Sequence, residues 1–295
     1  MPQFDYERVS SLQEAFDAVS GSKEVSVFMA GGTDLLVQMK EGKVRPQRII
    51  DVKGIREMDG MEISEAEISI GALTSIRTLE ISSTALEKLP LLTQAAAKLG
   101  SVQVRNRATI GGNLCNAAPS AETAPALLAL DTQAEIYGKA GMRIVDLNDF
   151  FLGPGSTVLD EGEILTCLKI PITQNQKGAI YYKLSTRKAM DLAFVGVAVL
   201  LELDGNDRIS KARIALGAVA PTPIRVPSAE ILLEGEILSD EIAQESAELA
   251  AQACQPISDH RASAEYRREM VKNLCQRGLL AAFRKAKSVT EVLEK

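Results

Sequence analysis

The chain has 295 residues, of which 46% are hydrophobic and 24% charged, a composition that excludes a disordered, collagen-like or low-complexity protein. Its 33 Lys and Arg residues against 39 Asp and Glu residues leave a net charge of −6, only 4% of residues are aromatic, and Trp is absent. Because nucleic-acid binders usually carry a basic surplus and stack bases on aromatic side chains, no nucleic-acid partner is expected.

The sequence also lacks the patterns that are typical of membrane proteins, metal sites and Ser-His-Asp triads. No apolar run approaches the roughly 20 residues that a membrane helix requires, and residues 1–8 have neither the basic nor the apolar region of a secretory signal. The four cysteines are widely spread and form no C-x-x-C pair, and His260 is the sole histidine. We therefore expect a cytoplasmic protein with no membrane insertion, no metal site and no Ser-His-Asp triad. No catalytic acid, base or nucleophile is predicted, so the chemistry must come from a cofactor.

The first part of the chain, residues 1–56, is predicted to form a small mixed α/β lobe. Ser10 or Ser11 is a plausible N-cap for its first helix. In order, the pattern indicates a helix at 11–19, a strand at 25–29, a glycine turn at 30–34, a helix at 35–39 and a strand at 48–52.

Residues 57–175 are predicted to form a second lobe. Its expected elements are a strand at 67–70 that leads into the segment 76–81, a helix at 91–99, a glycine turn at 107–114, a helix at 120–130 capped by Ser120, and strands at 133–137 and 163–170.

The polar stretch 171–178, which contains Pro and Gly, is predicted to be a linker to a further domain at 176–295. In that domain, strands at 193–203 and 208–216 are joined by Asp204-Gly205-Asn206, a typical hairpin turn. Helices are expected at 228–233, 239–254 and 262–286. The predicted fold class is α+β throughout.

Two short strings carry the functional signal: Ala30-Gly31-Gly32-Thr33-Asp34, here the first glycine motif, and Thr109-Ile110-Gly111-Gly112-Asn113, the second glycine motif. Adjacent glycines admit positive φ and leave backbone amides uncovered, so that consecutive N–H groups can converge on an anion. Thr33 is expected to cap the helix that follows. Neither motif contains Lys or Arg, which favours an internal diphosphate, and neither has P-loop or Rossmann spacing. A simple turn and a dinucleotide site both remain open.

Together with Gln103-Val104-Arg105-Asn106, these motifs resemble the FAD-binding medium subunit of molybdenum hydroxylases, such as xanthine, carbon monoxide and nicotinate dehydrogenases. The resemblance extends over nearly the whole chain, through Glu163-Ile164-Leu165, Tyr182-Lys183 and the Gly217–Pro223 stretch. It implies a FAD-binding domain of the vanillyl-alcohol-oxidase (PCMH) type at 1–175, with lobes at about 1–56 and 57–175. A C-terminal α+β domain of the CO dehydrogenase flavoprotein type would follow at 176–295.

The resemblance also implies which residues bind FAD. Glu122 stands where an acidic residue approaches the ribose or adenosine, Leu99 and Leu165 where side chains pack on the cofactor, and Lys183 where a side chain approaches the flavin ring. Without the resemblance, the two leucines fit a core and Lys183 fits the surface. The two diphosphate loops would comprise Val27, Phe28, Met29, Ala30, Gly31, Gly32, Thr33 and Asp34, and Thr109, Ile110, Gly111, Gly112 and Asn113. Since no His or Cys is poised near either loop for attachment, FAD is expected to be noncovalent; Cys115 is expected to be a small buried residue.

As a function, the resemblance implies a flavoprotein subunit that takes electrons from iron–sulfur clusters and passes them to an external acceptor, which stays open between NAD, a quinone, ferredoxin and oxygen. The molybdenum cofactor and the [2Fe–2S] clusters are expected only on partners, a molybdopterin-binding large subunit and a 2Fe–2S small subunit, in a higher oligomer of the heterotrimer. Xanthine or another N-heterocycle is the expected substrate of the complex. The alternatives are a free-standing flavin oxidoreductase and a non-catalytic assembly subunit that keeps the fold.

Overall fold

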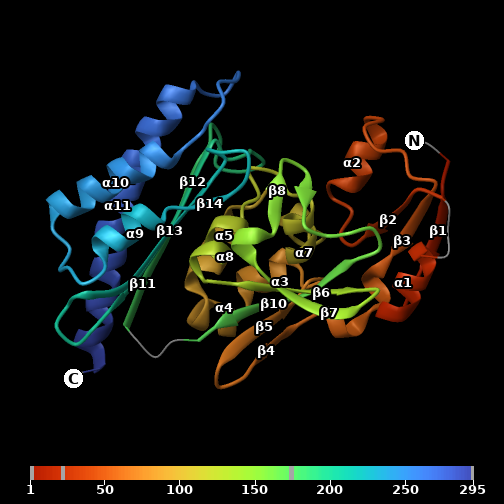
Figure 1. Ribbon diagram of the computed structural model, residues 1–295, viewed down its shortest axis with the longest axis horizontal. Helices are drawn as coiled ribbons and strands as arrows, with labels where there is room; N and C mark the ends of the chain where they lie inside the picture. Colours follow the sequence, from red (N-terminus) through yellow and green to blue (C-terminus); the bar gives the residue numbers. More distant parts are fainter. Residues whose placement is uncertain (1–2, 21–23, 173–175, 294–295) are drawn as a thin grey trace.

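A computed structural model describes residues 3–20, 24–172 and 176–293 of the chain. The elements form three parts in a row, with the N-terminal lobe at one end, a central lobe, and the C-terminal sheet and helices at the other end (Figure 1). None of the helices within the described ranges is long and apolar enough to span a membrane.

The N-terminal lobe is a three-stranded parallel sheet with helices. Ser11 caps the first helix as predicted: its Oγ accepts a hydrogen bond from the Glu14 N–H, while the Glu14 carboxylate accepts one from the Ser10 N–H. The sheet has the order β1-β3-β2. The elements are β1 (Asp5–Arg8), α1 (Leu12–Ser20), β2 (Ser26–Met29), α2 (Leu35–Lys40) and β3 (Arg48–Asp51).

The central lobe joins a five-stranded antiparallel sheet, in the order β4-β5-β10-β6-β7, to a group of short helices. Its core includes Ile68, Ile70, Leu127 and Leu168, all of them buried. The strands are β4 (Met61–Ile63), β5 (Glu67–Gly71), β6 (Gln133–Gly138), β7 (Gly141–Asp146), β8 (Phe151–Gly153), β9 (Ser156–Thr157) and β10 (Ile164–Pro171). The helices are α3 (Ile76–Ile81), α4 (Ser83–Lys88), α5 (Pro90–Lys98), α6 (Val102–Arg105), α7 (Ile110–Cys115) and α8 (Ala124–Ala129), with 3₁₀ turns at Val52–Gly54, Arg56–Met58 and Leu147–Asp149.

The C-terminal part is an antiparallel sheet with helices on one face. Strand β12 is buried along its whole length, because α11 covers one face of the sheet while α5 and α8 of the central lobe pack on the other (Figure 1). This sandwiching explains the nearly continuous apolar run of β12. The predicted hairpin is present as β12 and β13. The elements are β11 (Gln176–Leu184), β12 (Val195–Leu203), β13 (Ile209–Gly217), β14 (Ile224–Arg225), α9 (Pro227–Leu233), α10 (Asp240–Ala253) and α11 (Ala264–Leu293).

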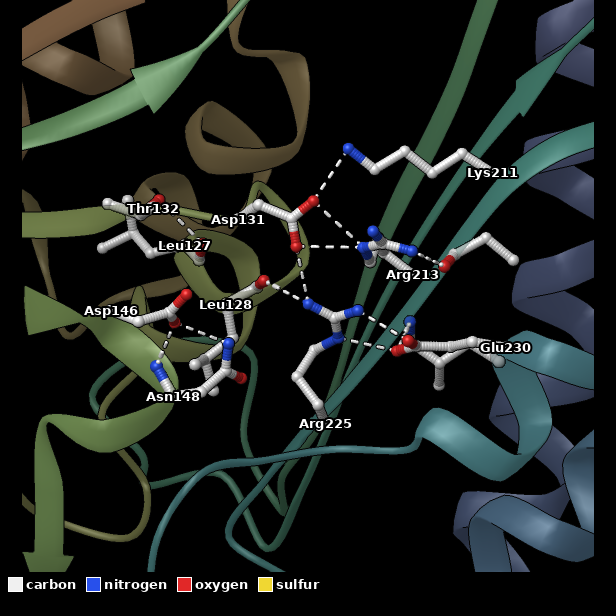
Figure 2. A network of polar contacts seen from close by, with 12 residues as sticks. Leu127, Leu128, Asp131, Thr132, Asp146, Asn148, Lys211, Arg213, Arg225 and Glu230 are labelled. Atoms are coloured by element: carbon white, nitrogen blue, oxygen red, sulfur yellow. Dashed lines mark hydrogen bonds and ion pairs between the residues drawn. The ribbon is translucent and has the colours of Figure 1, made fainter.

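Charged side chains join the end of α8 to the C-terminal sheet (Figure 2). Asp131 has a left-handed backbone, with φ 51°, and its carboxylate accepts from Arg213 Nε at 2.9 and 3.0 Å and from Arg225 Nη1 at 2.8 Å. Lys211 Nζ forms an ion pair with it at 2.8 Å. Arg225 in turn binds both oxygens of Glu230, at 2.6 and 2.5 Å. One carboxylate of the central lobe therefore gathers three cations from β13 and β14.

Two sequence predictions about the helices of the central lobe are wrong. The second glycine motif is not a turn: residues 110–115 are helical, with Thr109 as the N-cap. The helix expected at 120–130 begins only at Ala124, with Thr123 in the N-cap position, so Ser120 does not cap it. The reason is Pro125, which lacks an N–H and is tolerated only in the first turn of a helix. Of the predicted linker 171–178, residues 173–175 lie outside the described residues, and β11 already begins at Gln176.

Candidate functional site: a cavity between the lobes

A cavity of about 600 Å³ lies where the two glycine motifs meet. Elements from all three parts of the molecule line it, including the loop after β2, helix α7, strand β10 and a loop between β11 and β12. Its walls include these residues of the predicted site: Phe28, Met29, Ala30, Gly31, Gly32, Thr33, Asp34, Leu99, Thr109, Gly111, Gly112, Asn113, Glu122 and Leu165.

Three predicted site residues do not line this cavity. Val27 lies within β2, before the chain turns. Ile110 is the first residue of α7, and its side chain is fully buried in the core. Lys183 lies behind the wall, in contact with Glu122.

The first glycine motif presents unpaired backbone donors. Strand β2 ends at Met29, Gly32 turns the chain with φ 72°, and α2 begins at Leu35. Within the described part of the chain, the N–H groups of residues 31–35 donate no hydrogen bond. Thr33 is not the cap that the sequence predicted: Asp34 occupies the N-cap position and makes no side-chain capping bond. A row of free amides beside a cavity is a site for an anion.

The second glycine motif, by contrast, uses its amides internally. The N–H of Ile110 donates to Thr74 O at 3.0 Å and that of Gly111 to Ala72 O at 2.9 Å. The N–H of Gly112 donates to Thr109 Oγ1 at 3.1 Å. Neither glycine of this motif has a positive φ. The expectation that both motifs present uncovered amides from a glycine turn is therefore wrong for the second, which forms a wall of the cavity.

The glycines allow backbone segments to approach closely. A Cβ on Gly31 would lie 2.0 Å from Arg107 O, and a Cβ on Gly111 would lie 2.6 Å from Ala72 Cβ. A further contact joins the two sides of the site, since Gln38 Nε2 donates to Asn116 Oδ1 at 3.1 Å. Residues about eighty positions apart in the sequence are thus held side by side.

Glu122 is a buried carboxylate in the cavity wall, 5% exposed. Burial raises the pKa of this carboxyl, while hydrogen bonds from Lys183 and Tyr181 oppose the rise. Lys183 Nζ pairs with Glu122 and also donates to Lys98 O at 2.9 Å and Asp191 O at 2.8 Å. All three ammonium protons are therefore engaged, so Lys183 is a buried link between lobes and not a surface lysine.

Apolar side chains make up much of the remaining wall. Leu99 and Leu165 are 8% and 3% exposed, and both border the cavity while belonging to the central core. Cys115 also lines the cavity, and burial raises the pKa of its thiol to about 12. A thiol at neutral pH is a poor nucleophile. No histidine lies in the described wall, and no group of three metal-ligating side chains occurs among the described residues.

Sequence reasoning missed one wall entirely. Met190, Asp191 and Leu192, between β11 and β12, line the cavity, and the Met190 N–H donates to Gly100 O at 3.1 Å. This loop contains no glycine motif and lies about eighty residues after the second one. No signal in the sequence could have placed it at the site, because its position depends on how the C-terminal sheet packs against α5 and α8.

The walls suit a ligand that combines an anionic group with apolar parts and hydroxyl groups. The free amides of residues 31–35 suit a diphosphate, Leu99 and Leu165 suit an aromatic ring system, and Glu122 suits a hydroxyl donor. These features define an α+β protein with a site suited to a dinucleotide cofactor.

The comparisons with known proteins agree with this class. The family described as "FAD binding domain in molybdopterin dehydrogenase" matches residues 2–173, and the family "CO dehydrogenase flavoprotein C-terminal domain" matches residues 180–282. The chain is 33% identical to the xanthine dehydrogenase FAD-binding subunit of Escherichia coli O157:H7, over 92% of this chain and 93% of that one. It is 34% identical to the glyceraldehyde dehydrogenase medium chain of Sulfolobus acidocaldarius, over 92% and 96%.

Comparison with solved structures indicates the same family. Carbon monoxide dehydrogenase from Hydrogenophaga pseudoflava superposes with a TM-score of 0.93 at 33% identity, over 96% of this chain and 98% of that one. Quinoline 2-oxidoreductase from Pseudomonas putida 86 superposes with a TM-score of 0.90 at 31% identity, over 97% and 98%. The chain belongs to the family of FAD-binding flavoprotein subunits of molybdenum hydroxylases. The predictions of the family, of its α+β fold, of an oxidoreductase subunit and of FAD as cofactor are confirmed.

Proposed function

We propose that this chain holds one FAD noncovalently in the cavity and serves as the electron-transfer subunit of a molybdenum hydroxylase. The observation that carries the proposal is the row of unpaired amides at residues 31–35 beside a cavity with apolar walls. These amides would hold the diphosphate, with Thr109, Gly112 and Asn113 opposite. Bound FAD would supply the conversion between two-electron and one-electron transfer.

The remaining predicted contacts belong to the same proposal. Leu99 and Leu165 would pack on the cofactor, and Glu122 would accept a hydrogen bond from one of its hydroxyls. Lys183 would act on the cofactor indirectly, by holding the Glu122 carboxylate and the Asp191 carbonyl in place. No catalytic acid, base or nucleophile is assigned in this chain. Its residues would bind the cofactor, orient it and shield it from water.

The partners follow from the family. We propose a molybdopterin-binding large subunit and a small subunit with [2Fe–2S] clusters, assembled with this chain into a heterotrimer and a higher oligomer, in the cytoplasm. Relatives named for xanthine, glyceraldehyde and carbon monoxide are equally similar, at 33 to 34% identity. The similarity of this chain therefore does not select a substrate, as expected if the substrate binds on another subunit. Xanthine or another N-heterocycle stays our proposal for the complex.

Two measurements test the proposal. The purified protein should carry about one FAD per chain, and acid precipitation should leave the flavin in the supernatant. Yellow colour in the protein pellet would contradict noncovalent binding, and a folded chain that binds no flavin would favour the assembly subunit.

The isolated chain, loaded with FAD, should not reduce a dye in the presence of purines or aldehydes, whereas the complex with its partners should. Substrate-dependent dye reduction by the chain alone would favour the free-standing oxidoreductase. Co-purification with two further subunits would support the heteromer.

A further inference from the structure

We infer that Tyr181 is a positioning residue for the cofactor site, acting through Glu122. The Tyr181 hydroxyl donates a hydrogen bond of 2.7 Å to Glu122 Oε1, and both side chains are buried, at 4% and 5% exposure. Glu122 lines the cavity, whereas Tyr181 does not. The tyrosine belongs to β11 of the C-terminal sheet, so it reaches the cavity only through the carboxylate that it holds. This inference rests on the proposed function.

The two oxygens of Glu122 have different partners. Tyr181 binds Oε1 and the Lys183 ammonium binds Oε2. A single ion pair would leave the carboxylate free to rotate, because the last torsion of a Glu side chain is broad. Two donors on two oxygens fix the plane of the group. Since a carboxylate offers about four acceptor positions, the remaining ones can then be held at constant orientation toward a ligand in the cavity.

Tyr181 is itself held firmly. Its N–H donates to Gln94 Oε1 of α5 at 3.1 Å, and its strand pairs with β12, where Tyr181 lies opposite Ala198. Gly196 leaves room for the hydroxyl, because a Cβ at that position would lie 3.1 Å from Tyr181 Oη. Burial beside Glu122 raises the pKa of Tyr181 well above its ordinary value of 10.0. The hydroxyl therefore stays a proton donor throughout the physiological range.

The neighbouring Tyr182 offers a matched control. It lies on the opposite face of β11, where Arg277 sits 5.7 Å from the centre of its ring. Its hydroxyl has no hydrogen-bond partner among the described residues. Tyr182→Phe therefore removes the same atom from the same strand without touching Glu122.

The experiment compares Tyr181→Phe, Tyr182→Phe, Glu122→Leu and the double variant Tyr181→Phe with Glu122→Leu. Each protein is stripped of flavin and titrated with FAD, and the visible circular dichroism of the bound flavin is recorded. Tyr181→Phe should weaken FAD binding about tenfold, because the Glu122 carboxylate is no longer held on both oxygens and its orientation must then be fixed when the ligand binds. It should also change the dichroism of the bound flavin, whereas Tyr182→Phe should change neither.

The double variant separates positioning from general destabilisation. In the Glu122→Leu background, which has no acceptor for the Tyr181 hydroxyl, Tyr181→Phe should weaken binding by less than about twofold, because the group through which it acts is gone. Wild-type affinity and an unchanged flavin spectrum in Tyr181→Phe would overturn the inference, as would an equal loss in both backgrounds. If Glu122→Leu binds FAD too weakly to titrate, the flavin dichroism of Tyr181→Phe compared with that of Tyr182→Phe decides. Failure of the wild-type protein to bind FAD would instead overturn the proposed function.

Discussion

Gly31 lies against the backbone of Arg107, so closely that a Cβ at position 31 would be 2.0 Å from the Arg107 carbonyl oxygen. This contact joins the loop after β2 to the segment that leads into α7. The first glycine motif therefore meets the residues just before the second one through backbone atoms. Within the first glycine motif, Gly31 is needed for this close packing, whereas Gly32 is needed because the chain turns there with a φ of 72°.

Gly31→Ala should disrupt both the fold and the site. The added methyl cannot be accommodated unless the Arg107 backbone moves, and overpacking of this kind costs about 1–3 kcal/mol. We expect a lower free energy of unfolding together with a reduced ratio of flavin to protein. Gly153→Ala is the control, because nothing lies within 4 Å of a Cβ there. Unchanged stability and flavin content in Gly31→Ala would show that the two motifs do not need this contact.

Gly32→Ala and Gly42→Ala form a matched pair. Their φ angles are 72° and 73°, so both variants should lose about 1–2 kcal/mol of stability through left-handed strain. Only Gly32 borders the cavity. We expect weaker FAD binding in Gly32→Ala and normal binding in Gly42→Ala, measured by fluorescence titration beside urea unfolding. Equal affinities in the pair would argue against the first glycine motif as the diphosphate site.

Gly112→Val tests the opposite wall. Position 112 is helical and needs no positive φ, but a Cβ there would lie 2.9 Å from Thr109 Oγ1, so the capping hydroxyl must shift. The higher helix propensity of Val than of Gly offsets part of this cost, and the branched side chain occupies space in the cavity. FAD affinity should fall at least tenfold with little change in far-UV circular dichroism. Cys115→Ala, on the same helix, should keep its flavin; full flavin occupancy in Gly112→Val would place the diphosphate elsewhere.

Asp131→Asn should loosen the docking of the C-terminal sheet. Burial would raise the pKa of Asp131, but hydrogen bonds from Lys211 and Arg213 outweigh it and lower the pKa below 3.8. A carboxyl whose pKa is lower in the folded state stabilises the fold above its unfolded pKa, and this contribution is lost as the pH falls through the folded value. The variant should therefore be less stable by about 2 kcal/mol at pH 7, between the values for exposed and buried pairs.

The pH dependence distinguishes this charge effect from a packing effect. Thermal unfolding should show a constant deficit for Asp131→Asn from pH 7 to about 5, and the deficit should shrink as the pH drops below 3.8. Glu41→Gln, which breaks an exposed pair with Lys43, should show no measurable deficit. A deficit for Asp131→Asn that persists at the lowest pH would mean that the carboxylate charge is not its cause.

The sequence by itself determined the elements with strong local signals. Ser11 and Glu14 mark the start of α1, Asp204-Gly205-Asn206 sets the hairpin of β12 and β13, and the two glycine motifs indicate the family. These are interactions between near neighbours in the chain, so their patterns can be read directly. Where a local rule was overlooked, as with Pro125 at the start of α8, the prediction failed although the signal was present.

Only the tertiary structure decided how the motifs are used. That the amides of the first glycine motif stay free while those of the second bind Thr74 and Ala72 depends on which distant backbone packs against each. The same holds for Lys183, whose burial against Glu122 requires β11 to pack on the central lobe. Hydrogen bonds and ion pairs between residues thirty or more positions apart leave no periodic pattern in the sequence, because they arise only when distant segments of the chain pack together.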